Sequence, residues 1–134
     1  MLFRSEATGS DIFKIEPKEK YPADYYECID LAKKELQSKA RPELVEYLDN
    51  VEEYDLIYLG FPNWWGDVPM CVYTFLEDCD LSGKTIKPFC THEGSGFGGI
   101  LHKLESKYGL EFEDGLSIQG SSVSGAKSKV ENWL

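Results

Sequence analysis

The chain has 134 residues, and its 24 acidic and 14 basic side chains give a formal net charge of −10 at pH 7. This length suits one domain with a hydrophobic core and is too short for two. The negative charge argues against binding to nucleic acid or to an anionic membrane surface, and it favours a basic protein partner or simple solubility. We expect no transmembrane helix, because the apolar stretches are strand-sized, and no signal peptide, because residues 1–9 contain no apolar core segment.

Apolar runs of strand length alternate along the chain with amphipathic stretches of helical period. Strands are predicted at Asp11–Ile15, Tyr54–Leu59, Thr85–Thr91 and Gly115–Gly120. Helices are predicted from Pro22 to Leu36, over Arg41–Asn50, around Val72–Cys79, over Gly98–Tyr108, and near the C-terminus after a Ser124 cap. Pro88 would remove one donor from the ladder of the third strand. The alternation predicts an α/β fold with four parallel strands joined by right-handed crossovers, the second and third strands being adjacent.

The chain has four cysteines and two histidines, the residue types that most often bind zinc. The four cysteines, none of which forms a CxxC pair, are Cys28, Cys71, Cys79 and Cys90. This scatter is typical of reduced, buried thiols in a cytoplasmic protein rather than of disulfides or a zinc site. His92 and Glu93 begin like the zinc motif HExxH, but the glycines after them prevent a helix from presenting a second histidine. We therefore expect no metal site and a cytoplasmic location.

The most informative segment is Tyr54–Pro69, which reads YDLIYLGFPNWWGDVP. Its near-continuous apolar run indicates a strand covered on both faces, as in a parallel sheet. Trp64 and Trp65 follow at the carboxyl end of this strand, where open α/β sheets bind their ligands. Adjacent side chains on an extended loop point in opposite directions. One tryptophan can therefore close the core, while at least one faces a planar ligand or solvent.

A second loop, Thr91–Gly99 with the sequence THEGSGFGG, follows the next predicted strand. Its glycines allow close approach of the backbone to a ligand and free amide groups for hydrogen bonding. Gly94, Gly96 and Gly99 also match the dinucleotide fingerprint GxGxxG, with Asp114 at a suitable distance for a ribose contact. That fingerprint normally opens its fold, whereas too little chain follows it here. A flexible turn without a ligand is the third alternative. No nucleophile–base pair stands out, so we predict no catalytic side chain, as expected when a cofactor carries the chemistry.

The two loops together, in this order, resemble the flavodoxin family, and in particular short-chain bacterial flavodoxins with a Pro-x-Trp-Trp-Gly loop and a Gly-Ser-Gly loop. Further similar stretches are DIFKIEPKEKYPADYYE, FLEDCDLSGKTIKPF and VENWL, so the resemblance extends over nearly all of Glu6–Leu134. It implies an α/β, flavodoxin-like three-layer sandwich with a parallel sheet of strand order 2-1-3-4-5.

The resemblance also implies that the isoalloxazine ring of FMN lies between the two loops. Trp65 would stack on the ring, with Trp64 as the lesser candidate, while Asn63 and Gly66 would supply backbone contacts near the flavin N5. Phe97 would take a second ring-face role. The implied cofactor-binding residues are Pro62, Asn63, Trp64, Trp65, Gly66, Thr91, His92, Glu93, Gly94, Ser95, Gly96 and Phe97.

The function implied by the resemblance is FMN-dependent electron transfer to a redox partner with a basic docking surface, or a related flavin-dependent reductase activity. Two other functions stay open at this point. One is an acidic interaction module that has lost FMN and docks a partner through the tryptophan loop. The other is an NAD(P)-binding domain that uses Gly94–Gly99.

One departure from the family concerns the front of the chain. Full-length relatives begin with a strand, a turn of the form S-x-T-G-N-T that holds the FMN phosphate, and a helix, and nothing here matches them. We therefore expect the first strand, the phosphate loop and most of the first helix to be missing, roughly two dozen residues on typical element lengths. Residues 1–5 are interpreted as a non-native leader of sequencing or cloning origin, and residues 6–134 as one incomplete domain. Impaired FMN binding and unpaired edges on the first two predicted strands would follow.

Overall fold

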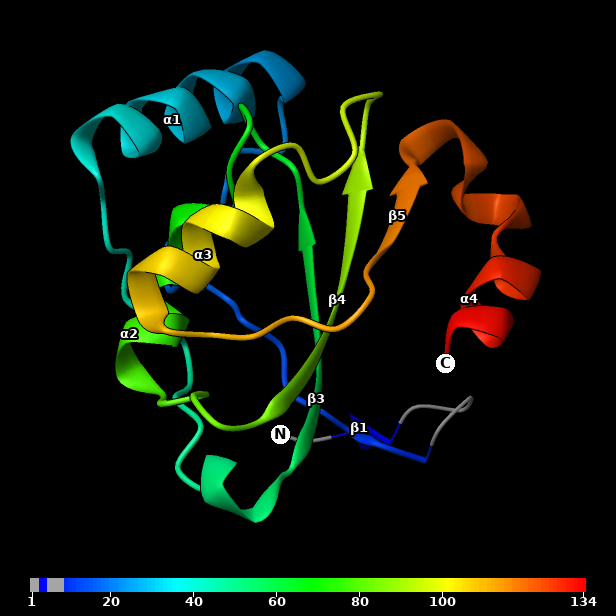
Figure 1. Ribbon diagram of the computed structural model, residues 1–134. Coiled ribbons are helices and arrows are strands. Elements are labelled where there is room, and N and C mark those ends of the chain that lie inside the picture. The colour runs from blue at the N-terminus through cyan, green and yellow to red at the C-terminus, as the bar shows by residue number, and fades with distance from the viewer. Residues whose placement is uncertain (1–2, 5–8) are drawn as a thin grey trace.

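The computed structural model describes residues 3–4 and 9–134. Its main sheet contains β3 (Leu56–Pro62), β4 (Thr85–His92) and β5 (Leu116–Gln119), and a separate ribbon contains β1 (Phe3–Arg4) and β2 (Asp11–Ile12). The helices are α1 (Tyr25–Ser38), α2 (Met70–Asp78), α3 (Ile100–Tyr108) and α4 (Lys127–Trp133), with short 3-10 turns at η1 (Val51–Glu53) and η2 (Gly120–Gly125). Figure 1 shows their arrangement. No helix among the described residues is long and apolar enough to cross a membrane.

The main sheet is parallel, in the order β3-β4-β5. Residues of β3 lie opposite those of β4 from the Leu56–Thr85 pair to the Pro62–Thr91 pair. Helix α2 connects β3 to β4, and α3 connects β4 to β5. The predicted α/β fold and the adjacency of the second and third strands are thus confirmed. Because the strands are parallel, the loops that follow β3 and β4 emerge at one edge of the sheet.

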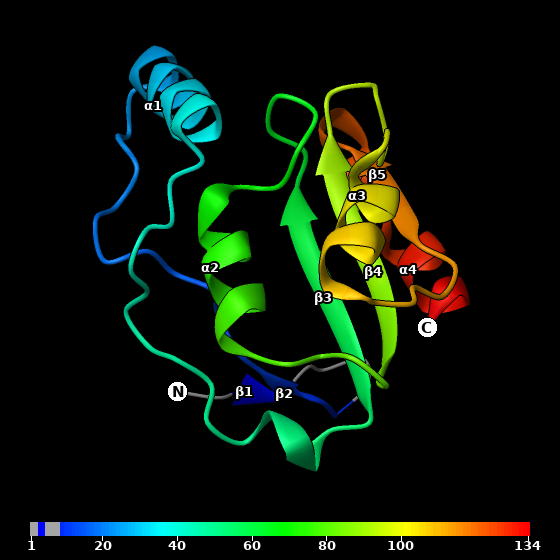
Figure 2. The same cartoon turned by 60° about the vertical axis from the view of Figure 1, so that its left-hand side comes forward.

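The sheet separates two layers of helices (Figures 1 and 2). On one face, Leu59 and Ile86 belong to the same buried core as Leu104 of α3 and residues of α2. On the other face, the Trp133 ring of α4 contacts Phe89 with a centroid distance of 5.9 Å. The Phe89 ring also lies so close to Gly60 that a Cβ there would be 2.1 Å from it. The result is the three-layer arrangement expected of the fold.

Coverage of the two faces is unequal. Leu59 and Phe61 of β3 are buried, whereas Leu56 is 45% exposed and Phe89 of the neighbouring strand is 41% exposed. The expectation that the Tyr54–Leu59 run is covered on both faces is therefore wrong. The helix that packs on this second face, α4, is only seven residues long, which accounts for the exposure of Leu56 and Phe89.

The first predicted strand differs most from expectation. Only Asp11–Ile12 is a strand, and it pairs antiparallel with Phe3–Arg4 rather than joining the main sheet in parallel. Phe13 stacks instead on Phe75 of α2, with a centroid distance of 5.7 Å. Within the described residues, β3 has a strand neighbour on one side only, so no intervening strand connects it to this segment. Part of the expected leader forms β1, and the rest of it lies outside the described residues, so its non-native origin stays a prediction.

The predicted helix at Arg41–Asn50 is also absent. The backbone there bonds to a distant segment instead: the Lys18 amide donates to the Glu43 carbonyl at 2.8 Å, and the Val45 amide donates to the Glu16 carbonyl at 2.7 Å. Leu44 between them is fully buried, and its burial favours this bridge over a solvent-exposed helix.

The C-terminal helix begins later than its predicted cap. Ser124 lies inside η2. The residue before α4 is Ala126, whose methyl side chain cannot cap the helix. The indole nitrogen of Trp133 donates to the Asp114 carbonyl at 2.8 Å, which joins the end of α4 to the segment before β5. Pro88 lies in the central strand β4 and is buried there, opposite Leu59, so the strand tolerates the loss of one ladder donor.

The cysteines in this fold are free thiols; Cys71, Cys79 and Cys90 are buried, and Cys28 is half-buried. Burial raises the pKa of Cys71 to about 11, and the nearby Glu35 carboxylate acts in the same direction. Burial likewise raises the pKa of Cys79 to about 11. Thiols of this kind are poor nucleophiles at neutral pH.

Truncation of the core should be far more damaging than truncation of the open face. Leu104 is fully buried, so Leu104→Ala should lower the free energy of unfolding by about 2–5 kcal/mol. The matched change Leu56→Ala, at a site that is 45% exposed, should lower it by less than about 1 kcal/mol. Urea unfolding followed by tryptophan fluorescence measures both values, and equal losses would contradict the assigned core.

Alkylation should report the protected thiols. At pH 8, iodoacetamide should modify Cys71 much more slowly than Cys28, because the Cys71 pKa of about 11 keeps that thiol protonated. The raised pKa also means that Cys71 favours folding below about pH 9 and that this contribution is lost as the pH rises towards 11. Peptide mapping by mass spectrometry gives the rates, and equal labelling of both cysteines in the folded chain would contradict the prediction.

Candidate functional site

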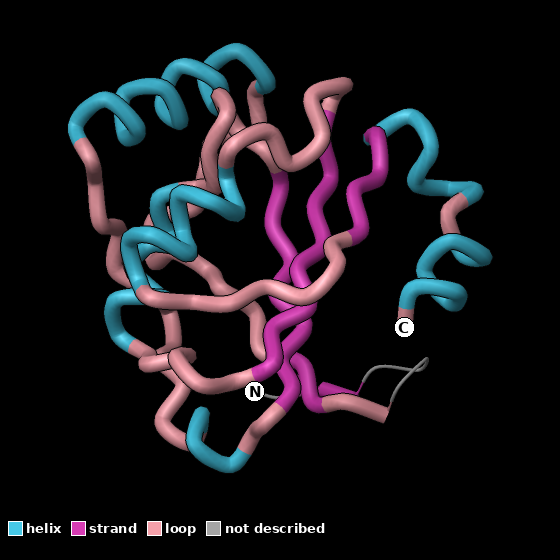
Figure 3. Tube along the Cα trace, in the orientation of Figure 1, coloured by secondary structure: helices cyan, strands magenta, loops and turns pink. Residues whose placement is uncertain are grey.

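The loops after β3 and β4 lie side by side at the carboxyl edge of the sheet (Figure 3). Pro62 ends β3 directly opposite Thr91 in β4, and the Asn63 amide donates to the Thr91 carbonyl at 2.8 Å. The parallel register therefore brings together two segments that are about thirty positions apart in the chain. Helix α1 lies next to the first of these loops.

The tryptophan loop is a tight turn. The Trp64 amide donates to the Asp67 carbonyl at 2.8 Å, and the Asp67 amide donates back to the Trp64 carbonyl at 3.1 Å. Trp65 and Gly66 occupy the two central positions with φ of 57° and 78°, the pattern of a type I′ turn. Glycine accepts this conformation readily, whereas for tryptophan it is uncommon and is held only by its surroundings. The turn presents Trp65 at its apex.

The two tryptophan rings have different environments. The Trp64 ring is half-buried and meets the Tyr21 ring edge-on, with a centroid distance of 5.0 Å. Trp65 is 52% exposed, although its indole nitrogen donates to the Ile29 carbonyl of α1 at 3.2 Å. The Lys33 ammonium lies 5.2 Å from the centroid of the Trp65 ring. The Trp64 ring thus packs against Tyr21, and the Trp65 ring is open to solvent.

The side chain of Asn63 joins the two loops. Its Nδ2 donates to Ser95 Oγ at 3.1 Å and to the Gly96 carbonyl at 2.8 Å. Its Oδ1 accepts from the Gly66 amide at 3.0 Å. The family resemblance implied a backbone role for Asn63 and gave no sign of this side-chain bridge. The only available signal was a polar residue placed directly after the strand-ending proline.

The second loop exposes its backbone. Thr91, Glu93 and Ser95 are exposed, and Gly94 and Gly96 have φ of 146° and 60°. The Gly94 amide donates to His92 Nδ1 at 2.9 Å, which leaves His92 half-buried beside the turn. These residues form an open, polar, mostly backbone surface next to the tryptophan turn.

Phe97 lies apart from this surface. Its ring contacts Phe61 edge-on with a centroid distance of 6.2 Å, and a Cβ at Gly115 would be 2.7 Å from it. The ring therefore packs towards the core, whereas a second ring-face role would require an exposed face. The implied site residues from Pro62 to Gly66 and from Thr91 to Gly96 are brought together, and Phe97 borders them from the inside.

Asp67 anchors the base of the turn and was not singled out from the sequence. It is 2% exposed, and its Oδ1 accepts from the Val68 amide at 2.8 Å and from the Tyr73 hydroxyl at 2.7 Å. Its Oδ2 accepts from the Lys103 ammonium of α3. Burial and the hydrogen bond to Asp67 raise the pKa of Tyr73, so the hydroxyl stays a donor. The carboxylate thus ties the tryptophan turn to both α2 and α3.

Tyr21 supports the turn from the other side. Its hydroxyl donates to Glu35 Oε2 of α1 at 2.7 Å. Burial, and to a lesser extent this hydrogen bond, raises the pKa of Tyr21. Since the Tyr21 ring also contacts Trp64, it connects α1 to the tryptophan loop. Among the described residues, no group of three or more His, Cys, Asp or Glu side chains is placed to hold a metal ion.

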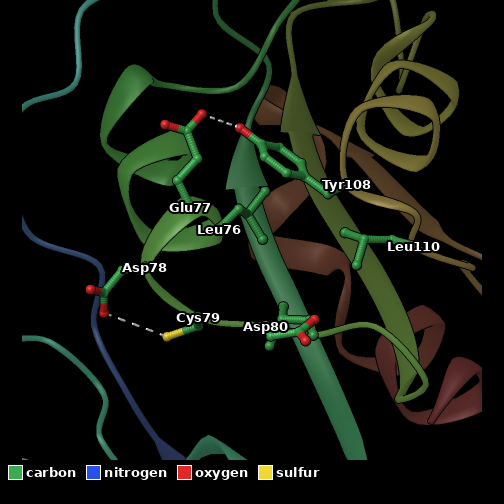
Figure 4. A pocket seen from close by; sticks show the side chains of 8 residues that line it. Leu76, Glu77, Asp78, Cys79, Asp80, Tyr108 and Leu110 are labelled. Atoms are coloured by element: carbon green, nitrogen blue, oxygen red, sulfur yellow. Dashed lines mark hydrogen bonds between the residues drawn. The ribbon is translucent and has the colours of Figure 1, made fainter.

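A separate pocket of about 380 Å³ lies at the other end of α2 (Figure 4). Its lining residues are Leu76, Glu77, Asp78, Cys79, Asp80, Leu81, Tyr108 and Leu110. The Tyr108 hydroxyl points to Glu77 and donates to it. The Arg41 guanidinium is 3.0 Å from both Glu77 oxygens, and this hydrogen bonding lowers the pKa of Glu77. The polar groups here satisfy one another, so we assign the pocket no role in the site.

Loss of the buried anchor should destabilise the protein. Asp67→Ala leaves the Tyr73 hydroxyl, the Val68 amide and the half-exposed Lys103 ammonium without their acceptor. This loss should lower the free energy of unfolding by about 2–3 kcal/mol. Asp80→Ala, an exposed Asp→Ala change that removes local bonds to Ser82, should leave the free energy of unfolding nearly unchanged. Urea unfolding measures the stability of both variants. An Asp67→Ala variant as stable as the parent chain would show that the hydrogen bonds of Asp67 do not stabilise the fold.

Comparisons with known proteins agree with this geometry. The family model described as "Flavodoxin" matches residues 4–134. A solved structure described as a "Putative flavoprotein" from Bacteroides uniformis is 34% identical, with a TM-score of 0.78, over 94% of this chain and 84% of that chain. One from Bacteroides eggerthii, described in the same words, is 27% identical, with a TM-score of 0.74, over 92% and 83%.

A third solved structure, a flavoprotein from Lactobacillus acidophilus in complex with FMN, is 24% identical. It aligns with a TM-score of 0.63 over 88% of this chain and 75% of that one, and it supports the fold alone. No curated protein matches the chain. The parallel β3-β4-β5 sheet, the paired loops at its carboxyl edge and the family match over residues 4–134 lead to one conclusion: this chain belongs to the flavodoxin family.

Proposed function

We propose that the chain is a flavin-binding electron-transfer protein, or a flavin-dependent reductase of the same family, and that the two loops hold the isoalloxazine ring of FMN. The observation that supports this most is the exposed Trp65 ring, held at the apex of a tight turn beside the open Gly94–Gly96 backbone. A planar aromatic ligand matches such a surface, because one face can stack while its polar edge meets amide and carbonyl groups. The Lactobacillus acidophilus flavoprotein solved with FMN has the same fold.

The residues present fit the ring portion of such a cofactor. Trp65 would stack on it, and the exposed backbone of Thr91–Gly96 would contact its polar edge. The Gly66 amide is already bonded to Asn63, so it would orient the turn rather than bind the ring directly. When bound, FMN would supply the electron-accepting chemistry that no side chain of this site offers. Acidic charge in a chain of net charge −10 disfavours a reduced, anionic flavin and suits a basic redox partner.

Among residues 3–4 and 9–134, no comparable site for the phosphate of FMN stands out. The sequence contains no S-x-T-G-N-T turn, and such a turn normally gives a phosphate several charge-assisted hydrogen bonds. At about 1.5–3 kcal/mol each, the absence of two such bonds weakens affinity by roughly a hundredfold or more. We therefore propose that this chain binds FMN weakly and mainly through the ring.

Two flavins separate the ring from the phosphate. In a fluorescence titration, this chain should bind FMN and riboflavin with affinities that agree within about tenfold, since little discrimination comes from the phosphate. Trp65→Ala should weaken both by about tenfold through lost stacking. The control Tyr26→Ala, which removes another exposed aromatic ring (76% exposed) on α1, should change neither.

Other results would point elsewhere. Submicromolar FMN binding with strong rejection of riboflavin would reveal a phosphate site that the sequence does not indicate. A chain that binds neither flavin nor NADH would favour the acidic interaction module. Binding of NADH alone would favour the dinucleotide function of the Gly94–Gly99 loop, which does lie between a strand and a helix as its fingerprint requires.

A further inference from the structure

Asn63 joins the two loops through hydrogen bonds of both its backbone and its side chain. Its backbone amide bonds to Thr91 at the end of β4, and its side-chain Nδ2 bonds to Ser95 and Gly96. Its Oδ1 turns back to accept from the Gly66 amide of its own loop. In the part of the chain that the structure describes, Asn63 is the donor of the hydrogen bonds between residues 63–67 and 91–97.

The chemistry of the amide suits this position. A primary amide offers two donors on one atom and an acceptor on the other. The second loop presents an oxygen of Ser95 and a carbonyl of Gly96, whereas the first loop presents the Gly66 N–H. A carboxylate at this position could accept from Gly66 but would set its second oxygen against the Gly96 carbonyl. An aliphatic side chain would make none of these three hydrogen bonds, and the Gly96 carbonyl would keep only its contact with the Cys90 thiol at 3.7 Å.

The bonds of Asn63 end on residues that border or occupy uncommon backbone conformations. Gly66 and Gly96 have φ of 78° and 60°, and Trp65, next to Gly66, has φ of 57°. A tryptophan in the left-handed region persists only where the surroundings hold it. The bond from the Gly66 amide to Asn63 closes the turn directly behind Trp65, while the bonds to the second loop set how far apart the two loops lie.

We propose that Asn63 is a positioning residue for the flavin ring: its side chain holds the tryptophan turn and the Gly94–Gly96 loop at the spacing that the ring requires. This inference rests on the proposed function and adds to it, because the side chain acts on the flavin through Trp65 and Gly96 rather than by touching it. It also predicts that the loops keep this spacing in the flavin-free protein.

The first experiment uses the flavin-free chain. In Asn63→Ala, the Gly66 amide loses its acceptor, so its hydrogen exchange, measured by NMR, should accelerate at least about tenfold. The matched control is Asn50→Ala, which removes the bond from Asn50 Nδ2 to Glu53 Oε2 at 3.2 Å near the amino end of β3. Exchange at Gly66 should be unchanged in the control. Unaltered exchange in Asn63→Ala would overturn the proposed role of the side chain.

The second experiment measures flavin binding. Asn63→Ala should weaken FMN and riboflavin by the same factor, about tenfold, because the ring is the part affected. Ser95→Ala, which removes one of the two acceptors on the second loop, should weaken both by about threefold. Asn50→Ala should bind like the parent chain. Urea unfolding of each variant shows whether the folded fraction accounts for the losses, and flavin affinity equal to the parent in folded Asn63→Ala would overturn the proposal.

Asn63→Asp supplies a readout that a merely structural role would not move. Its carboxylate faces the Gly96 carbonyl at neutral pH, whereas the protonated acid can donate one hydrogen bond there. Flavin affinity of Asn63→Asp should therefore recover as the pH falls through the range in which the carboxyl group titrates, while that of Asn63→Ala should follow the parent chain. Parallel pH profiles for both variants would contradict the proposal. If the parent chain binds no flavin at all, the proposed function is wrong, and Gly66 exchange alone decides whether Asn63 holds the turn.

Discussion

Parallel pairing of β3 with β4 is the constraint on which the rest of this structure depends. It places Pro62 opposite Thr91, so the tryptophan loop and the glycine-rich loop leave the sheet at the same edge and begin side by side. Each loop by itself would be an ordinary turn. Their shared edge creates a surface with an exposed indole on one side and an open backbone on the other, which is the arrangement that a planar cofactor needs.

Two polar residues convert that juxtaposition into a defined geometry. Asp67 is buried and ties the base of the tryptophan turn to Tyr73 of α2 and Lys103 of α3. Asn63 ties the top of the turn to Ser95 and Gly96 of the second loop. A buried carboxylate is tolerated only when it is fully hydrogen-bonded, so the Asp67 cluster specifies one arrangement of the helices and the turn. The site is thus rigid at its base, with Trp65 exposed at its tip.

The elements that the sequence predicted well are those whose pattern is local. The strands at β3, β4 and β5 and helices α1, α2 and α3 follow from apolar runs and periodicity within short windows. The predictions that were wrong depended on distant partners. The Asp11 segment pairs with Phe3–Arg4 rather than with the main sheet. Arg41–Asn50 is not helical, because its backbone bonds to the Glu16–Lys18 segment. The Ser124 cap was wrong because a 3-10 turn intervenes before α4.

The sequence by itself determined the α/β class, the two loops after adjacent strands and the flavodoxin resemblance, because strand-ending prolines, paired tryptophans and clustered glycines are local signals. Tertiary structure alone decided which tryptophan is exposed, that Phe97 turns towards Phe61 in the core, and that Asn63 and Asp67 hold the turn. These features depend on contacts between residues more than thirty positions apart, such as Asn63 with Gly96 and Asp67 with Lys103, in addition to local bonds. Local sequence patterns do not indicate these long-range contacts, which form only when the sheet brings the segments together.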